Sequence, residues 1–445
     1  MKHTTPQPIT EGVIWKQLLK YFFPILLGTF FQQMYNTVDT IVVGRFVGTE
    51  ALAAVGSTSA LISLVTGFFV GLSTGATVLL SQYYGAEDKE GTKHALHNGL
   101  ILAVFMGVTV TALGLVGCRT LLGWMNTPEN CMESSMTYGR VYFLGAISST
   151  IYNMGAGILR AMGDSKRPTI FLMLTCVMNI LGDLLFVLVF RMGVAGVALA
   201  TVVSQTVSAV LVLITLMRLP EEIAFRPYRL RMNGKLLRGI LAVGIPAGLQ
   251  MTTFDLAGTL IQSSINSFGE VTVAAWTAYC KTDFITWMIS GAFGVSITTF
   301  VGQNFGAGKL DRVKKSVWVC MGMSMALVGL LSIVELIFRT PVLGIYTTDP
   351  EVIRLAAYLM LLTVPLNFMF MPVEIFAGAL RGAGRSMTPM VIMLICICLY
   401  RVTWVMTLVR QYHYIEMLAI CYPISWVLAS VVLWVAYLCW SKRNK

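Results

Sequence analysis

The sequence contains two copies of one hydrophobic unit, and the second copy starts 221 residues after the first. The segment 156–160, AGILR, recurs at 377–381 as AGALR, and each copy is followed by glycine, serine and proline at the same spacing. The segment 82–86, QYYGA, recurs at 303–307 as QNFGA. A constant offset over so long a stretch indicates internal duplication. Duplicated sets of hydrophobic helices form many secondary transporters, so the repeat constrains the fold and points toward function.

Composition places the chain in a membrane. Of its 445 residues, 56% are hydrophobic and only 12% are charged, and the mean hydropathy is +0.75. A soluble domain carries about 25% charged residues, so this chain lacks the polar surface to face water on all sides. Apolar stretches of about 20 residues recur along it, and the ~10-residue alternation of a membrane β-barrel is absent. We therefore expect an all-α polytopic membrane protein that has the lipid bilayer as a partner.

The apolar pattern predicts twelve transmembrane helices, six in each copy. Their predicted ranges are 15–43, 52–82, 93–118, 134–161, 167–190, 194–217, 237–268, 273–304, 314–338, 351–381, 387–409 and 413–440. Because six spans return the chain to its starting side, the two six-helix bundles should share one orientation, as a parallel repeat about an axis along the membrane normal. This predicts an amino-terminal bundle at 1–217, a cytoplasmic basic linker at 218–236 and a carboxy-terminal bundle at 237–445.

The net charge of +11 fits a membrane topology better than nucleic-acid binding. Lys and Arg concentrate in the loops on the side of the amino terminus, so the positive-inside rule predicts that both termini are cytoplasmic. No short apolar segment with a small-residue cleavage site is evident at the start, and we expect the first span to be retained. The nine cysteines form no CxxC pair and most lie in apolar spans. We expect no disulfide framework, no metal centre built on cysteine and no cofactor.

Polar residues inside the first copy suggest an ion-binding site. Asp39 lies in the first predicted span, Asn179 and Asp183 lie on one face of the fifth, and Thr201 lies near the middle of the sixth. Ionisable groups at bilayer depth are costly and usually face a cavity or one another. The oxygens of these four side chains could bind a small hard cation such as Na⁺, or the acids could take up a proton. The alternative is that Asn179 and Asp183 only form hydrogen bonds to neighbouring helices.

The second copy carries its own polar residues, of both signs. The candidates for a second polar or substrate site are Asp255, Lys281, Asp283 and Glu374. Lys281 could form an ion pair with Asp283 or Glu374, which would make the set structural, and the alternative is contact with a substrate. Glu335 and Arg401 also fall in predicted spans, and we expect Glu335 near the outer interface. Neither polar set is duplicated, because the other copy has different residue types at the corresponding positions.

Four stretches together carry a family resemblance: QQMYNTVDTIVVG at 32–44, NILGD at 179–183, GQNFGA at 302–307, and the AGxLR segments of spans four and ten. With these motifs, the chain resembles the bacterial multidrug and toxic compound extrusion (MATE) transporters over essentially its whole length. The resemblance implies a cation antiporter that expels organic cations using a proton or sodium gradient.

The resemblance also implies residue roles. In the family, an Asp in span one with an Asn and an Asp in span five bind the coupling cation, and Asp39, Asn179 and Asp183 match these positions. Thr201 matches a supporting hydroxyl in span six. Some members rely instead on acids in spans seven and ten, and Asp255 and Glu374 are offset from those positions. We therefore expect the first copy to hold the coupling site.

The expected function is secondary active efflux of lipophilic organic cations by alternating access, in exchange for H⁺ or Na⁺. We expect a monomer in the bacterial cytoplasmic (inner) membrane. A flippase for lipid-linked precursors, which the superfamily also contains, would need a strongly basic cleft, whereas most intramembrane charges here are acidic. A membrane-embedded enzyme would need a nucleophile–base set or metal ligands. None of the four histidines lies in the middle of a span, and no HExxH, P-loop or GxSxG motif occurs.

Overall fold

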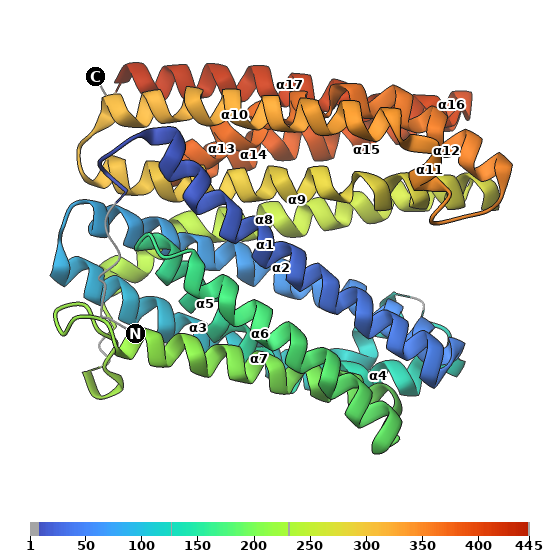
Figure 1. Ribbon diagram of the computed structural model, residues 1–445, viewed down its shortest axis with the longest axis horizontal. Helices are drawn as coiled ribbons and strands as arrows, with labels where there is room; N and C mark the ends of the chain where they lie inside the picture. Colours follow the sequence, from blue (N-terminus) through green and yellow to red (C-terminus); the bar gives the residue numbers. More distant parts are fainter. Residues whose placement is uncertain (1–8, 126, 230–231, 444–445) are drawn as a thin grey trace. The chain divides into compact units, whose positions relative to one another are not determined.

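A computed structural model describes residues 9–125, 127–229 and 232–443, and in these ranges it contains helices and no β-strand (Figure 1). The predicted all-α membrane fold is confirmed. Ten helices of the described part are long and apolar enough to cross a membrane. The other two predicted spans correspond to α1 (Ile14–Val42), which ends in a polar stretch, and to the pair α4 (Glu129–Leu144) and α5 (Ala146–Ala161). The chain termini, which we predict to be cytoplasmic, lie outside the described residues.

The helices form two compact units, of which the first comprises residues 23–248. Besides α4 and α5, the helices that lie wholly within it are α2 (Thr49–Gly85), α3 (Lys89–Trp124), α6 (Lys166–Leu184) and α7 (Gly193–Met217). Single π-helical turns extend α1 at Val43–Val47 and α6 at Leu185–Val189, and a 3₁₀ turn lies at Pro227–Arg229.

The second unit comprises residues 10–22 and 249–443. Its helices are α9 (Glu270–Gly306), α10 (Leu310–Ile337), α11 (Arg339–Leu343), α12 (Pro350–Thr363), α13 (Met371–Gly382), α14 (Met387–Met393), α15 (Tyr400–Trp404), α16 (Arg410–Tyr412) and α17 (Ile415–Arg443). A 3₁₀ segment, Val364–Phe370, joins α12 to α13, and π-helical turns at Leu394–Leu399 and Val405–Val409 join α14 to α15 and α15 to α16.

Two helices, α1 and α8 (Gly234–Asn266), contribute to both units. The first part of α1, up to Phe22, belongs to the second unit, whereas α8 belongs to the first unit up to Gly248. Pro24 and Pro246 lie next to these changeover points. Proline removes a hydrogen bond inside a helix and favours a bend, so each helix is locally weakened where it passes from one unit to the other.

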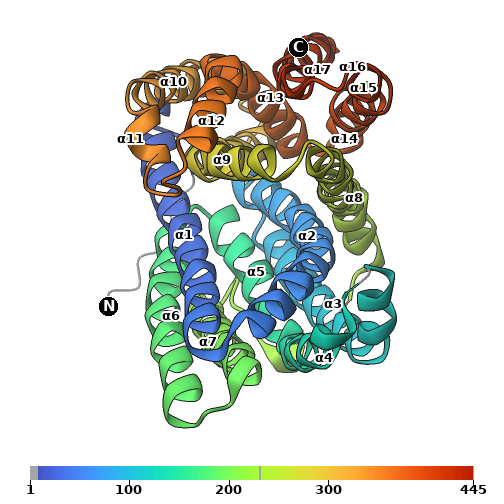
Figure 2. The same ribbon diagram turned by 90° about the vertical axis from the view of Figure 1, so that its right-hand side faces the viewer.

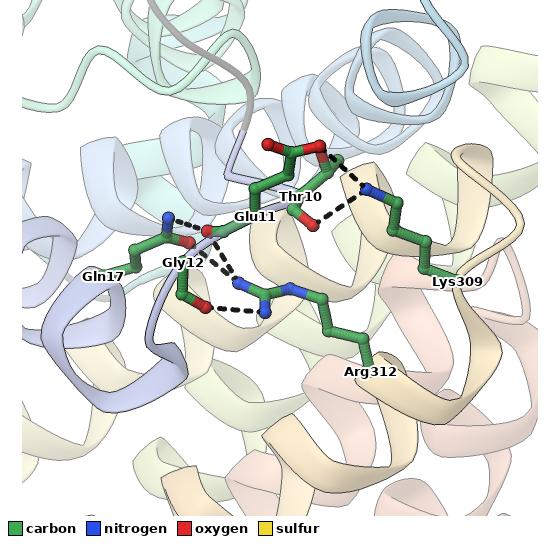
Figure 3. Close-up of polar contacts among 6 residues, drawn as sticks. All are labelled: Thr10, Glu11, Gly12, Gln17, Lys309 and Arg312. Carbon is green, nitrogen blue, oxygen red and sulfur yellow. Dashed lines mark hydrogen bonds and ion pairs between the residues drawn. The ribbon is translucent and has the colours of Figure 1, made fainter.

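The segment before α1 is fixed to the second unit by polar contacts (Figure 3). Arg312, in the first turn of α10, donates hydrogen bonds to the carbonyl oxygens of Gly12 and Glu11, at 2.8 and 2.9 Å. Lys309, just before α10, donates to the carbonyl oxygen of Thr10 at 3.1 Å and pairs with the Glu11 carboxylate at 3.6 Å. Two basic side chains thus hold the early chain against the start of α10.

The segment predicted as a linker, 218–236, packs onto the first unit in its described part. Four of its apolar side chains are buried in that unit's core: Leu219, Ile223, Ala224 and Phe225. The backbone amide of Arg226 donates to Nε2 of His97 on α3 at 3.3 Å. The first unit therefore continues to residue 248 and differs from the predicted division at 217 and 237. The boundary differs because the apolar residues of this charged segment are buried in the hydrophobic core of the first unit.

Glycines let the first half of α8 pack backbone to backbone on α2. A Cβ atom at Gly71 would lie 2.5 Å from the Cα of Gly248, and one at Gly244 would lie 2.5 Å from a backbone oxygen of α2. At Gly75 the added carbon would overlap the carbonyl oxygen of Ile240. Small residues at such positions are what allow membrane helices to approach closely. The contact holds this half of α8 in the first unit.

We predict that Gly75→Ala destabilises the protein by about 1–3 kcal/mol, because the new methyl group meets backbone that cannot rotate away. The matched control is Gly56→Ala on the same helix, where nothing lies within 4 Å of the added carbon. Thermal unfolding in detergent should show a lower midpoint for the first variant only. Equal midpoints for the two variants would contradict the packing described here.

Candidate functional site

The structure brings the four predicted site residues of the first copy together. Asp39 lies near the end of α1, Asn179 and Asp183 lie one turn apart on α6, and Thr201 lies on α7. Helices α6 and α7 run side by side (Figure 2). The four side chains are 5%, 2%, 0% and 3% exposed respectively. All belong to the first unit, so one packed body positions the whole site.

A short chain of hydrogen bonds links three of these residues. The Nδ2 of Asn179 donates to Oγ1 of Thr201 at 3.3 Å, and Thr201 Oγ1 lies 3.3 Å from Oδ2 of Asp39. The same hydroxyl lies 3.1 Å from the carbonyl oxygen of Val197, one helical turn earlier. Since a hydroxyl has a single hydrogen, Thr201 can donate either to Asp39 or to its own helix. The site therefore has two hydrogen-bonded arrangements that differ in how well Asp39 is stabilised.

Several oxygens of the site are buried without a hydrogen bond. Asp39 Oδ1, Asn179 Oδ1 and both carboxylate oxygens of Asp183 have no hydrogen-bond partner among the described residues. The carboxyl groups of Asp39 and Asp183 are nevertheless close enough to interact. Two neighbouring buried carboxylates cannot both be ionised without a large free-energy cost, so the pair favours a shared proton or a bound cation. The unpartnered oxygens suit a hard cation such as Na⁺, which prefers oxygen ligands.

A small, partly open pocket adjoins this site inside the first unit. Asn179 and Thr201 form part of its wall, so two of the four predicted site residues border open space. The remaining wall residues are uncharged: Gln32, Tyr35, Ser149, Tyr152, Asn153, Leu172, Thr175, Ser204, Gln205 and Ser208. A second small pocket shares Ser149 and Asn153 with the first and is lined mostly by apolar side chains. Polar and aromatic side chains therefore line the first pocket, which lies beside the two buried acids.

The four candidates of the second copy are not brought together. Asp255 and Lys281 are exposed, whereas Asp283 is 1% exposed. Glu374 pairs with Arg381 on the same helix, with 3.6 Å between Oε2 and Nη2. Lys281 forms no ion pair with Asp283 or Glu374 among the described residues, so the structural alternative based on that pair is not present. Two residues that are two positions apart on a helix point to different sides, so Lys281 faces out while Asp283 faces the core.

Sequence reasoning missed the buried partners of Asp283. Its carboxylate accepts hydrogen bonds from Trp287 Nε1 at 2.8 Å and Asn367 Nδ2 at 2.6 Å. Glu335 is 7% exposed, accepts from Thr286 at 3.3 Å and interacts with Asp283. The expectation that it lies near the outer interface concerns its depth in the membrane and stays a prediction. A sequence pattern could have indicated the contact with Trp287. Asp283, Thr286 and Trp287 have i, i+3, i+4 spacing, which places them on one face of α9.

Comparisons with known proteins agree with this architecture. A protein-family model described as MatE matches residues 24–185 and 246–405. The chain is 28% identical to the probable multidrug resistance protein YoeA of Bacillus subtilis (strain 168), over 98% of this chain and 96% of that protein. It is 27% identical to a protein of Shewanella oneidensis described as an FAD transporter, over 86% of each chain.

A solved structure has the same fold. It is described as the outward-facing conformation of a multidrug resistance MATE family transporter of the MOP superfamily, with a TM-score of 0.92 and 21% sequence identity. The match covers 100% of this chain and 99% of that one. The family model covers well over half of the chain, with one matched segment in each copy of the repeat. The chain therefore belongs to the MatE family, whose members are multi-pass membrane transporters and not enzymes.

Proposed function

We propose that the chain is a secondary active multidrug efflux antiporter, which exports lipophilic organic cations in exchange for H⁺ or Na⁺ by alternating access. The observation that carries the proposal is the buried pair Asp39 and Asp183, with unpartnered oxygens beside an uncharged cavity. The names of several relatives, which include multidrug resistance proteins of Bacillus and Thermotoga, support a drug as cargo. Another relative is described as an FAD transporter, so the cargo class rests on the site's chemistry.

Exchange follows from competition for the same negative charge. When Asp39 or Asp183 is ionised, its charge attracts a cationic cargo in the adjoining cavity, where aromatic rings such as Tyr35 and Tyr152 add cation–π attraction. When a proton or Na⁺ neutralises the pair, that attraction is lost and the cargo is released. Each ion that enters down a membrane potential of 100 mV supplies about 2.3 kcal/mol, to which any concentration gradient adds.

The remaining proposals concern the setting. We place the protein in the bacterial cytoplasmic membrane as a monomer, with both termini cytoplasmic, because the basic loops lie on that side of the predicted topology. Flipping of a lipid-linked pyrophosphate is less well supported, since the residues lining the described cavity of the first unit carry no basic group.

We predict that Asp39→Asn and Asp183→Asn each lower efflux of a fluorescent organic cation from cells by roughly tenfold or more, because each removes a charge that the exchange requires. The matched control is Asp311→Asn, which alters an exposed acid in the first turn of α10. Membrane abundance should be measured for all three variants. Full efflux by both site variants at normal abundance would refute the proposal.

We predict that Thr201→Val lowers the concentration of coupling ion that gives half-maximal transport by about tenfold, because ionised Asp39 loses a hydrogen bond that contributes about 1.5–3 kcal/mol and therefore holds a neutralising ion more tightly. Thr201→Ser keeps the hydroxyl and should stay near the parent value. The measurement uses proteoliposomes in which pH and sodium gradients are imposed separately, so that it also identifies the ion. If valine and serine variants behave alike, the hydroxyl does not act on Asp39.

A further inference from the structure

The repeat places a buried arginine where the first unit has its acidic site. Helix α17 of the second copy is the counterpart of α7 in the first copy. At the repeat offset of 221 residues, three buried residues of α7 correspond to three buried residues of α17: Val197 to Leu418, Ser204 to Ser425 and Val212 to Leu433. In this register Thr201 corresponds to Tyr422. The π-helical turn Leu394–Leu399 adds one residue before α15, and Arg401 then takes the position that Asn179 has on α6.

The contacts of Arg401 match this correspondence. Its Nε donates to Oγ of Ser425 at 2.9 Å, and its guanidinium carbon lies 4.0 Å from the centroid of the Tyr422 ring. Arg401 thus reaches α17 as Asn179 reaches α7, and its side chain is buried with 9% of its surface exposed. Helices α15 and α17 are in contact within the second unit. The duplicated scaffold therefore presents a cation in one unit and carboxylates in the other.

No carboxylate neutralises Arg401 among the described residues. The titratable groups close enough to interact with it are Cys398, Cys421 and Tyr422, all uncharged at neutral pH. The buried acids of the second unit have other partners: Asp283 accepts from Trp287 and Asn367, Glu335 accepts from Thr286, and Glu374 pairs with Arg381. A buried cation without a counter-ion costs several kcal/mol.

The unused donors of Arg401 point to the missing partner. Ser425 and the Tyr422 ring engage Nε and one face of the guanidinium. Its two Nη atoms donate to no acceptor in the described part of the chain, so their N–H groups are left for a ligand. Two adjacent Nη groups form a planar fork that matches the two oxygens of a carboxylate or phosphate. A purely structural role would be filled at lower free energy by an uncharged side chain of similar size.

We propose that Arg401 is the anchor of an oxyanion subsite in the second unit, formed with Ser425 and Tyr422, for a carboxylate or phosphate group. The group belongs either to the cargo or to a lipid headgroup. In the first case the inference rests on the proposed function and extends it to zwitterionic cargo, which carries an anion as well as a cation.

A matched pair of dyes tests the subsite. Tetramethylrhodamine carries a free carboxylate, and its methyl ester has the same cationic ring system without that charge. Binding of each to the full-length protein in phosphatidylcholine vesicles is measured by fluorescence anisotropy, without any ion gradient. We expect Arg401→Gln to weaken binding of the carboxylate dye by roughly tenfold or more and to leave the ester within about twofold, as loss of a charge-assisted hydrogen bond requires. Arg401→Lys should fall between, because it keeps the charge and loses the fork.

Arg381→Gln is the matched control, since it removes a buried arginine of the same unit that already has an acidic partner. It should lower the thermal midpoint without changing the ratio of the two dye affinities. A wild-type protein that binds only the ester, or an equal loss of both dyes in Arg401→Gln, overturns the subsite. Because no gradient is applied, failure of ion coupling would leave this comparison intact.

Vesicles with added phosphatidylglycerol separate the two sources of the anion. If the lipid raises the thermal midpoint of the wild type but not of Arg401→Gln, and displaces the carboxylate dye, the oxyanion is a headgroup phosphate. If it does neither while the dyes still differ, the oxyanion belongs to the cargo. Either result supports an oxyanion at Arg401 and decides where it comes from.

Discussion

The first unit is organised around two carboxyl groups in an apolar interior. Asp183 is fully enclosed and makes no hydrogen bond within the described residues, while Asp39 has one donor, Thr201. Ionised carboxylates in such surroundings cost several kcal/mol unless a cation compensates them. The packing of α1, α6 and α7 is therefore complete only with a proton or a cation present. In the proposed exchange, this requirement links ion occupancy to the packing of these helices.

The duplicated scaffold has diverged in its polar groups. The same helix pair presents Asn179 and Thr201 in one copy, and Arg401 and Tyr422 in the other. The second unit also holds Asp283 and its partners on α9, at positions that have no acidic counterpart in the first copy. Duplication preserved the apolar stripes that set packing, while the few polar positions changed separately. The charged residues inside the two bundles therefore indicate the function of each unit more directly than they indicate the fold.

The sequence predicted the fold class from short-range regularities, whereas the grouping of Asp39, Asn179, Asp183 and Thr201 was expected from their chemistry and from the family resemblance. Apolar runs of membrane length mark the helices, and a spacing of four puts Asn179 and Asp183 on one face. What could not be predicted depends on which helix faces which. Glu335 is buried because Thr286 of a neighbouring helix meets it, and nothing in its own segment indicates that contact.

The linker illustrates the same limit. Its charges predict exposure, yet Ile223 and Phe225 enter a core that only the folded first unit provides. The division between units was hidden for a similar reason, since glycines on α2 and α8 mark a close contact only once the two helices are known to meet.

The shared helices have a consequence for how the protein is made. Residues 10–12 are synthesised about 300 residues before their partners Lys309 and Arg312. This segment therefore lacks these partners until the start of α10 has been synthesised, and the second unit is complete only when α17 has been added. If the gene were split between the two copies, the second half would lack residues 10–22 of its unit, and the first half would lack the part of α8 that belongs to the first unit. The two copies of the repeat therefore do not coincide with the two compact units.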